Sequence, residues 1–555
     1  MKPFNYNTTF KPILIISGII MVAILITLLF PMFFRTDDSI NLYWSAHHSI
    51  KDILNVPVAS FWGMYRPFVN LFFSITYALF GLNPFGYQVV CISIFLIDLY
   101  LIYKLSKLYF NKTSAMSTII LFFVLFYSHF QMVFWFSDIV FIMHLMFTLL
   151  AIIFFLKSKR NSYYMIVSFL FALMGALTKE PAILIVTAFV FGDFLANVTK
   201  QNYLKKLWIV APYLAIGIWL ILISPVMETR FKQASDPTAF LSNLDYRYRF
   251  YFGYLLTGTK LIIPLMLSIP FALSIQKSWW KKSMIVLLAI PCYFYPYYSI
   301  VFIFTITGLF AIQQKKLLPF YFWMAGTSLT LPFIAYITPT YLFEFSFGFS
   351  IFMGYVLTSQ LIEKQLIPLY QKDKKMGGIL LIALAVLSTP IAYKLITSQV
   401  KALRLVVETR KNLSNGIDFI HSNKSKFKYI VIPDQETNET HEERAKNAIR
   451  SNDEKAKAMK TMNARQLQAY ISLINCDSIR VIPYSLFCKS KLINQNQIVL
   501  LLQNDEDIRF AKENKIVGKN LYAFSYYGTN NLNIVSLSKK TSEININSNN
   551  NNNFK

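Results

Sequence analysis

Residues 12–34 read PILIISGIIMVAILITLLFPMFF, and the string Arg35-Thr36-Asp37-Asp38 follows directly. The run contains no charged residue, and about 20 apolar residues are enough to cross a membrane as a helix. Comparable runs recur along most of the chain. The sequence therefore predicts an all-α, polytopic membrane protein in which two adjacent carboxylates follow the first span.

Composition points to the same class of protein. Hydrophobic residues make up 55 % of the 555 residues and charged residues only 15 %, which excludes an ordinary soluble protein. The net charge of +26 could suggest nucleic acid as a partner, but the lysines gather at the ends of apolar runs, as in cytoplasmic loops. No nucleic-acid partner is expected, and the first run is expected to stay attached as a signal anchor.

Lysines and arginines also predict which side of the membrane each loop faces. Lys2 and Lys11 place the N-terminus inside, so that Asp37 and Asp38 face outward. The same rule gives 13 spans, within a range of about 11–13, and an outside C-terminal domain; an error of one span would place that domain inside. The spans are expected at residues 12–34, 85–110, 114–127, 135–156, 163–178, 182–198, 207–223, 251–275, 284–312 (a tight hairpin of two), 318–337, 345–361 and 378–396.

Three regions follow from this pattern. Residues 1–398 are expected to form the transmembrane domain, with residues 35–84 as its first outer loop. Residues 399–543 are expected to form a small soluble α/β domain, extracytoplasmic by the span count. Its expected elements are strands at 427–432, 479–482 and 498–502 and a helical region at 441–472. Residues 544–555 are nearly all asparagine and are expected to be disordered.

Polar residues gather at the expected outer ends of the spans. A charged side chain in the middle of a membrane helix costs about 2.5–3.5 kcal/mol, so the positions of ionisable residues are informative. The set at the outer rim comprises Asp37, Asp38, His47, His48, Arg66, His129, Asp138, Lys179, Glu180, Arg247, Arg249 and Glu344. Separate loops therefore contribute to one rim.

This set contains the groups that a transfer reaction requires. Asp37 or Asp38 could remove a proton from an acceptor hydroxyl. Cations could hold a charged leaving group, and the candidates are Arg66, Lys179, Arg247 and Arg249. The sequence assigns no metal ligand, because His47 and His48 lack the further spaced ligands of a metal site. A divalent metal ion as cofactor is left open.

Each candidate also has a purely structural interpretation. A loop carboxylate is usually just solvated, and Lys179 and Glu180 could form a simple intrahelical pair at the membrane surface. Asp98, in the middle of its span, is expected to have a pairing or packing role. His144 is expected to be either a core histidine or a residue that lines a cavity.

Four strings in the first outer loop resemble a known family. Their order resembles the first outer loop and second span of the GT-C membrane glycosyltransferases. The resemblance is closest to the protein O-mannosyltransferase branch that includes the transmembrane and tetratricopeptide-containing mannosyltransferases. The strings are Asp37-Asp38, Phe61-Trp62-Gly63, Tyr65-Arg66-Pro67 and Phe80-Gly81-Leu82-Asn83-Pro84-Phe85-Gly86-Tyr87.

Weaker matches follow, so that the resemblance covers about residues 1–396. His129, Gln131 and Trp135 are similar to a family stretch in which an acid stands at the position of Gln131. Leu177-Thr178-Lys179-Glu180 resembles the family's Lys-Glu motif. Tyr341-Leu342-Phe343 resembles a late segment in which the family has an arginine in place of Thr340. The tetratricopeptide array itself is absent.

The resemblance implies a function. One of Asp37 and Asp38 would be the catalytic base, and the donor would be a sugar on a polyprenyl or dolichyl phosphate. The acceptor would be a hydroxyl group of a protein, glycan or lipid on the outer side of the membrane, and the sugar would be transferred with inversion. The residues expected at the donor phosphate or elsewhere on the substrates are Arg66, His129, Asp138, Lys179, Glu180, Arg247 and Arg249.

Three rival functions remain at this point. Another membrane transferase could move a different group, such as an aminosugar to a lipid or a sugar to a glycan, rather than a sugar to protein. A transporter or lipid flippase would also be polytopic and basic inside, but it should place ionisable residues at mid-membrane and show two related halves. Most acids here fall on the outer rim, and the chain shows no internal repeat. A non-catalytic scaffold that presents the C-terminal domain would tolerate replacement of the acids in the first loop.

Overall fold

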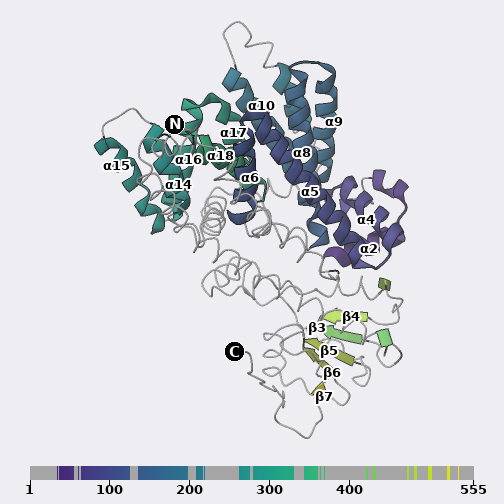
Figure 1. Ribbon diagram of the computed structural model, residues 1–555. Coiled ribbons are helices and arrows are strands. Elements are labelled where there is room, and N and C mark those ends of the chain that lie inside the picture. The colour runs from purple at the N-terminus through teal and green to yellow at the C-terminus, as the bar shows by residue number, and fades with distance from the viewer. Residues whose placement is uncertain are drawn as a thin grey trace, which may run out of the picture. The chain divides into compact units, whose positions relative to one another are not determined.

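The computed structural model describes residues 34, 37–55, 60–61, 64–125, 135–197, 208–216, 218, 262–274, 279–294, 296–330, 343–359, 363 and 368, together with short pieces and five strands between 421 and 536 (Figure 1). The chain divides into two compact units, and each is described here by itself. The first comprises Met1–Phe30, Ile50–Phe72 and Gly86–Val400, and the second comprises Pro31–Ser49, Phe73–Phe85 and Lys401–Lys555. The expected spans at 12–34 and 378–396, the helical region at 441–472 and the asparagine-rich tail lie outside the described residues.

The first unit is built mainly of apolar helices that fall on the stretches expected to span a membrane. Two of them, Pro84–Tyr109 and Phe136–Ser158, are long and apolar enough to cross a membrane by length and composition. The total number of spans stays a prediction. The helices are α5 (Pro84–Tyr109), α6 (Lys112–Leu125), η2 (Phe136–Asp138), α8 (Ile139–Ser158), α9 (Tyr163–Thr178), α10 (Pro181–Asn197), α14 (Ile262–Ser274), α15 (Trp279–Leu287), η4 (Ile290–Tyr293), α16 (Pro296–Gln313), η5 (Lys315–Leu317), α17 (Leu318–Thr330) and α18 (Phe343–Tyr355).

Small residues allow these helices to pack closely. The closest pairs are α8 with α9, α10 with α17, α6 with α18 and α17 with α18. A Cβ atom on Gly192 of α10 would lie 2.6 Å from the Cα atom of Pro319 on α17, and a Cβ atom on Gly348 would lie 3.1 Å from the ring of Trp323. Glycines at such crossings let helix backbones approach each other, as is common between membrane helices. Every residue of α18 is buried.

The turn between α4 (Pro67–Phe80) and α5 is explained by its local sequence. Gly81 has φ +55°, and its N–H donates to Tyr77 O, which is how a glycine ends a helix. The side chain of Asn83 accepts a hydrogen bond from Phe85 N, and Pro84 begins α5. The string that resembles the family is therefore a helix stop followed by a helix start.

Two short strands lead into α4. β1 (Ser60–Phe61) and β2 (Met64–Tyr65) pair antiparallel, with Ser60 opposite Tyr65. Arg66 follows β2 directly and precedes the first residue of α4. The 3-10 helix η1 (Ile50–Leu54) lies further upstream. Whether α4 lies along the membrane surface or forms half of a re-entrant hairpin stays a prediction.

The second unit contains α2 (Asp37–His47) and a five-stranded sheet in the order β4-β3-β5-β6-β7. The pairs from β4 to β6 are parallel, and only β7 is antiparallel to its neighbour. β3, β4 and β5 fall on the three stretches expected to be strands, whereas β6 and β7 were not expected. The strands are β3 (Tyr429–Ile432), β4 (Arg480–Pro483), β5 (Ile498–Leu502), β6 (Tyr522–Ser525) and β7 (Val535–Ser536). Because the expected helical region at residues 441–472 lies outside the described residues, the α/β class of this domain stays a prediction.

Candidate active site

The connection between α9 and α10 carries Lys179 and Glu180, whose side chains pair with distant parts of the chain. Lys179 Nζ lies 2.5 Å from Glu344 Oε1, a residue 165 positions away. Glu180 Oε2 accepts a hydrogen bond from Arg66 Nη2 at 2.9 Å, across 114 positions. The interpretation of Lys179 and Glu180 as a simple local pair is therefore wrong. Through these contacts the segment between α9 and α10 is held against Arg66, which directly precedes α4, and against Glu344 in α18.

The ion pair of Lys179 and Glu344 is buried, with side chains only 3 % exposed. Lys179 Nζ also lies 3.4 Å from the ring centroid of Phe141, in the first turn of α8. Glu344 belongs to the first turn of α18, and its carbonyl oxygen accepts a hydrogen bond from Trp323 Nε1 at 3.0 Å. A lone buried charge is costly, so each partner stabilises the ionised form of the other.

His144 extends this cluster by one turn of α8. Its Nδ1 donates to the carbonyl oxygen of Phe141 at 2.8 Å, and since a carbonyl only accepts, this contact places a proton on Nδ1. The other ring nitrogen, Nε2, lies 3.2 Å from Glu344 Oε1. Glu344 therefore has a lysine and a histidine on the same carboxylate oxygen.

Electrostatics at Lys179 combine two opposing effects. Lys179 lies in the connection between α9 and α10, outside both apolar helices. Burial lowers the pKa of its ammonium group to about 8, and the Glu344 carboxylate opposes this by raising the pKa. The charges of Arg66 and Glu180 also act on Lys179, which shows that the two ion pairs form one electrostatic group.

Arg66 and Glu180 form the accessible part of this group. Their side chains are 24 % and 23 % exposed, in contrast to the buried Lys179 and Glu344. A guanidinium group offers a planar fork of N–H donors that fits phosphate oxygens in pairs. An anion that approaches this end of the bundle would therefore meet Arg66 before Lys179.

A second polar group lies at the other end of α8. Lys159 Nζ lies 2.7 Å from Asp193 Oδ1, and Tyr109 Oη donates to the same oxygen at 3.0 Å. Phe141 and Ser158, near the two ends of α8, are about 25 Å apart at 1.5 Å per residue. This separation is close to the roughly 30 Å of a bilayer's hydrocarbon layer. The Lys179 cluster and the Asp193 group thus mark opposite ends of an apolar bundle.

Comparison with known proteins identifies the segment that carries most of this cluster. Residues 65–228 match the dolichyl-phosphate-mannose-protein mannosyltransferase family. The matched segment includes Arg66, His144, Lys179 and Glu180, and it covers less than half of the chain. No curated protein and no solved structure gives a significant match to the chain.

The match supports a GT-C, mannosyltransferase-like membrane domain. The mannosyltransferase family is integral to membranes, in agreement with the two helices that are long and apolar enough to cross one. Glu344 lies beyond the matched residues, and Asp37 and Asp38 precede them. The predicted mannosyltransferase-like character of the chain is therefore confirmed, while the tetratricopeptide-containing branch stays a prediction.

The expected catalytic acids begin α2 in the second unit. Asp38 is fully buried and Asp37 is half-buried. Acids are favourable in the first turn of a helix because they interact with the positive end of its dipole, so this position has a structural explanation too. The catalytic role of these acids in a mannosyltransferase-like reaction stays a prediction.

The other expected residues divide into placed and undescribed ones. Asp138 is buried one turn before Phe141, at the start of α8. His47 Nδ1 bonds to the carbonyl oxygen of Tyr43, and His48 Nδ1 to that of Trp44, which are local helix contacts. Among the described residues, no group of three or more His, Cys, Asp or Glu side chains could hold a metal ion. The remaining expected residues, His129, Arg247 and Arg249, lie outside the described part of the chain.

Sequence reasoning did not assign Glu344 and His144 to the site. Glu344 was noted at the outer rim, and His144 was interpreted as a core or cavity residue. The signal that could have found both is an ionisable side chain inside or at the end of an apolar helix. Only the fold shows that Glu344 contacts Lys179 and that His144 contacts Glu344.

Proposed function

We propose that this chain is a membrane glycosyltransferase that moves a sugar from a polyprenyl-phosphate carrier to a hydroxyl group on the outer side of the membrane. The observation that carries the proposal is the pair of neighbouring ion pairs, Arg66–Glu180 and Lys179–Glu344, at one end of an apolar helix bundle. Three of these four residues lie within the segment that matches the mannosyltransferase family. Cations beside apolar helices suit a substrate that joins a phosphate to a hydrocarbon chain.

Arg66 is the residue proposed to bind the phosphate. Its guanidinium is partly exposed, whereas the ammonium group of Lys179 is buried against Glu344 and Phe141. A phosphate that arrives at Arg66 would share it with Glu180. Lys179 would then act as a positioning residue, because its ion pair with Glu344 fixes the end of α9 against α18.

Asp37 is the proposed general base. It is half-buried and can meet a hydroxyl group, whereas Asp38 is fully buried. In the proposed step, the Asp37 carboxylate takes the acceptor's proton, and the acceptor oxygen attacks the anomeric carbon opposite the phosphate. The bond from that carbon to the phosphate oxygen breaks, its electrons leave with the polyprenyl phosphate, and the configuration inverts.

Further contacts to the donor are proposed from His129, Asp138, Arg247 and Arg249, as the resemblance implies. A requirement for a divalent metal ion is left open. The acceptor is a hydroxyl group of a protein, glycan or lipid. Membership in the tetratricopeptide-containing branch is proposed for the transmembrane part alone.

One observation favours a transporter instead. Asp98 is completely buried in the middle of α5, and among the described residues neither of its carboxylate oxygens has a hydrogen-bond partner. Proton-coupled transporters use such mid-membrane carboxylates. If the chain is a glycosyltransferase, Asp98→Asn keeps sugar transfer at the wild-type rate, and if it is a transporter, that substitution abolishes the activity.

Sugar transfer from a panel of radiolabelled polyprenyl-phosphate sugars tests the proposal. Membranes with the wild type are compared with Arg66→Gln, Arg66→Lys and a matched control, Arg160→Gln, an exposed arginine beyond the far end of α8. We expect Arg66→Gln to lower transfer by at least about a hundredfold, on the scale of losing one preorganised donor to a developing anion. Arg66→Lys should retain part of the activity and Arg160→Gln all of it. Equal transfer by Arg66→Gln and wild type would contradict the assignment.

A further inference from the structure

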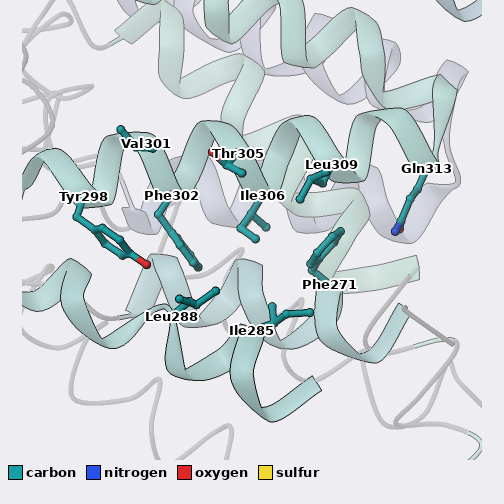
Figure 2. Close-up of a pocket in the computed structure, with 10 residues that line it drawn as sticks. All are labelled: Phe271, Ile285, Leu288, Tyr298, Val301, Phe302, Thr305, Ile306, Leu309 and Gln313. Carbon is teal, nitrogen blue, oxygen red and sulfur yellow. The ribbon is translucent and has the colours of Figure 1, made fainter. Parts of the chain in front are cut away.

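A separate apolar groove lies between α14, α15 and α16 (Figure 2), and none of its lining residues belongs to the Lys179 cluster. Its volume is about 530 Å³, within the range of about 300–1,000 Å³ found for ligand sites. All of its lining residues are uncharged. They are Phe271, Ile285, Leu288, Tyr298, Val301, Phe302, Thr305, Ile306, Leu309 and Gln313.

The groove follows one face of α16. From Tyr298 to Gln313 this helix rises about 22 Å at 1.5 Å per residue. One leaflet of a bilayer contributes about 15 Å of hydrocarbon, half of the full thickness. Val301 and Leu309 are 63 % and 41 % exposed on this face. The groove is thus long enough for the acyl chains of one leaflet.

The ends of α14 and α16 define one end of the groove, at Gln313. Ser274 Oγ at the end of α14 donates to Gln313 Oε1 at 3.3 Å, so the ends of α14 and α16 meet there. Figure 2 shows Gln313 at one end of the groove and Tyr298 at the other, with Ile285 nearer to Gln313 than Leu288 is.

Two lysines place positive charge toward the Gln313 end of the groove. Lys282 precedes Ile285 by three residues on α15, which places both on the same side of that helix. Lys315 is exposed two residues beyond Gln313.

The same end of the bundle lies away from the proposed donor phosphate. Lys316, next to Lys315, lies 4.1 Å from the ring centroid of Tyr355, the last residue of α18. Glu344, the partner of Lys179, is in the first turn of α18. Glu344 and Tyr355 are about 16 Å apart along α18, eleven residues at 1.5 Å each. A phosphate at Lys315 is therefore a different phosphate from one at Arg66.

We propose that this groove binds an anionic phospholipid, with its acyl chains along α16 and its phosphate at Lys282 and Lys315. Basic side chains at the end of a groove between membrane helices are the usual means of recognising anionic headgroups. The apolar lining supplies no selectivity among headgroups, so the lysines carry it. The proposal does not depend on the proposed function, because the groove shares no residue with the Lys179 cluster.

Native mass spectrometry of the purified full chain tests this site. The protein is exchanged into detergent with equal amounts of phosphatidylglycerol and phosphatidylcholine, and bound lipid is counted. We expect phosphatidylglycerol to be favoured, and each of Lys282→Gln and Lys315→Gln to lower that preference about fivefold, the effect of one cation near a membrane surface. Leu309→Trp should displace the bound lipid by filling the groove. The matched controls, Lys107→Gln and Leu170→Trp, change exposed residues on α5 and α9 and should bind as wild type.

Several results would overturn the proposal. Equal retention of the two lipids, or the same retention in Leu309→Trp as in wild type, would show that this groove is not a site for an anionic lipid. Displacement of phosphatidylglycerol from the wild type by polyprenyl phosphate, together with loss of polyprenyl-phosphate binding in Leu309→Trp, would assign the groove to the donor instead. A dimer that Leu309→Trp dissociates would assign it to a second copy of the chain.

Discussion

Replacing Glu344 by glutamine removes one partner of the buried ion pair while keeping the size of the side chain. Loss of one partner of such a pair usually costs about 3–5 kcal/mol of folding free energy, because the other charge is left buried and unpaired. We expect the low end, about 3 kcal/mol. Burial already lowers the pKa of Lys179 to about 8, so an unpaired Lys179 can give up its proton.

The effect of this substitution should depend on pH. Below about pH 8 the ammonium group of Lys179 is charged, and removal of Glu344 leaves that charge without a partner. Above pH 8 Lys179 of the wild type is already mostly neutral, so Glu344→Gln removes little attraction between the two side chains. The loss of stability should therefore be large at pH 6 and small at pH 9.

Thermal unfolding of the purified protein in detergent measures this loss, with Lys159→Met as the control. Lys159 also forms an ion pair, but its side chain is 46 % exposed. Its partner Asp193 is buried and keeps hydrogen bonds from Tyr109 Oη and Asn197 Nδ2 when Lys159 is lost, so Lys159→Met should cost less than Glu344→Gln. The double variant Lys179→Met/Glu344→Gln should recover most of the stability lost in Glu344→Gln. If Glu344→Gln unfolds at the same temperature as Lys159→Met, or loses more stability at pH 9 than at pH 6, the reasoning about the buried pair is refuted.

Two further predictions concern the fold. Gly192→Ala should destabilise the protein by about 1–3 kcal/mol, because its new methyl group would overlap the backbone of Pro319, whereas Gly308→Ala, which meets only the ring of Tyr321 at 3.3 Å, should cost less. Equal thermal midpoints for the two variants would argue against close packing of α10 on α17. Asn83→Ala should cost about 1 kcal/mol through loss of the cap on Phe85 N, and Asn83→Asp should retain the stability. Identical melting of Asn83→Ala and wild type would show that this cap contributes nothing.

The sequence predicted the helices of the first unit well, because each apolar run is a local signal. It could not predict that Lys179 pairs with Glu344 or Glu180 with Arg66, since these partners are 165 and 114 positions apart. Charge and hydropathy patterns carry no information about contacts at that distance.

One string that resembles the family also has a local structural role. The glycine, asparagine and proline at residues 81, 83 and 84 were interpreted as a family string, and the structure shows that they end one helix and begin the next. In the C-terminal part, three strands were expected from buried apolar runs. β7 was missed because it has only two residues, and β6, Tyr522–Ser525, because it contains none of the Ile, Val and Leu residues that mark β3, β4 and β5.

The role proposed for Asp37 is that of the base in sugar transfer from a polyprenyl-phosphate donor. It is tested most directly by measuring transfer in membranes that contain wild type, Asp37→Asn or Asp38→Asn, with each donor of the panel. We expect the wild type to transfer sugar from one of these donors and Asp37→Asn to lower the rate at least about a hundredfold, as for loss of a general base. Asp38→Asn should lower it less. If no donor is consumed, or Asp37→Asn matches the wild type, the glycosyltransferase mechanism proposed for this chain is contradicted.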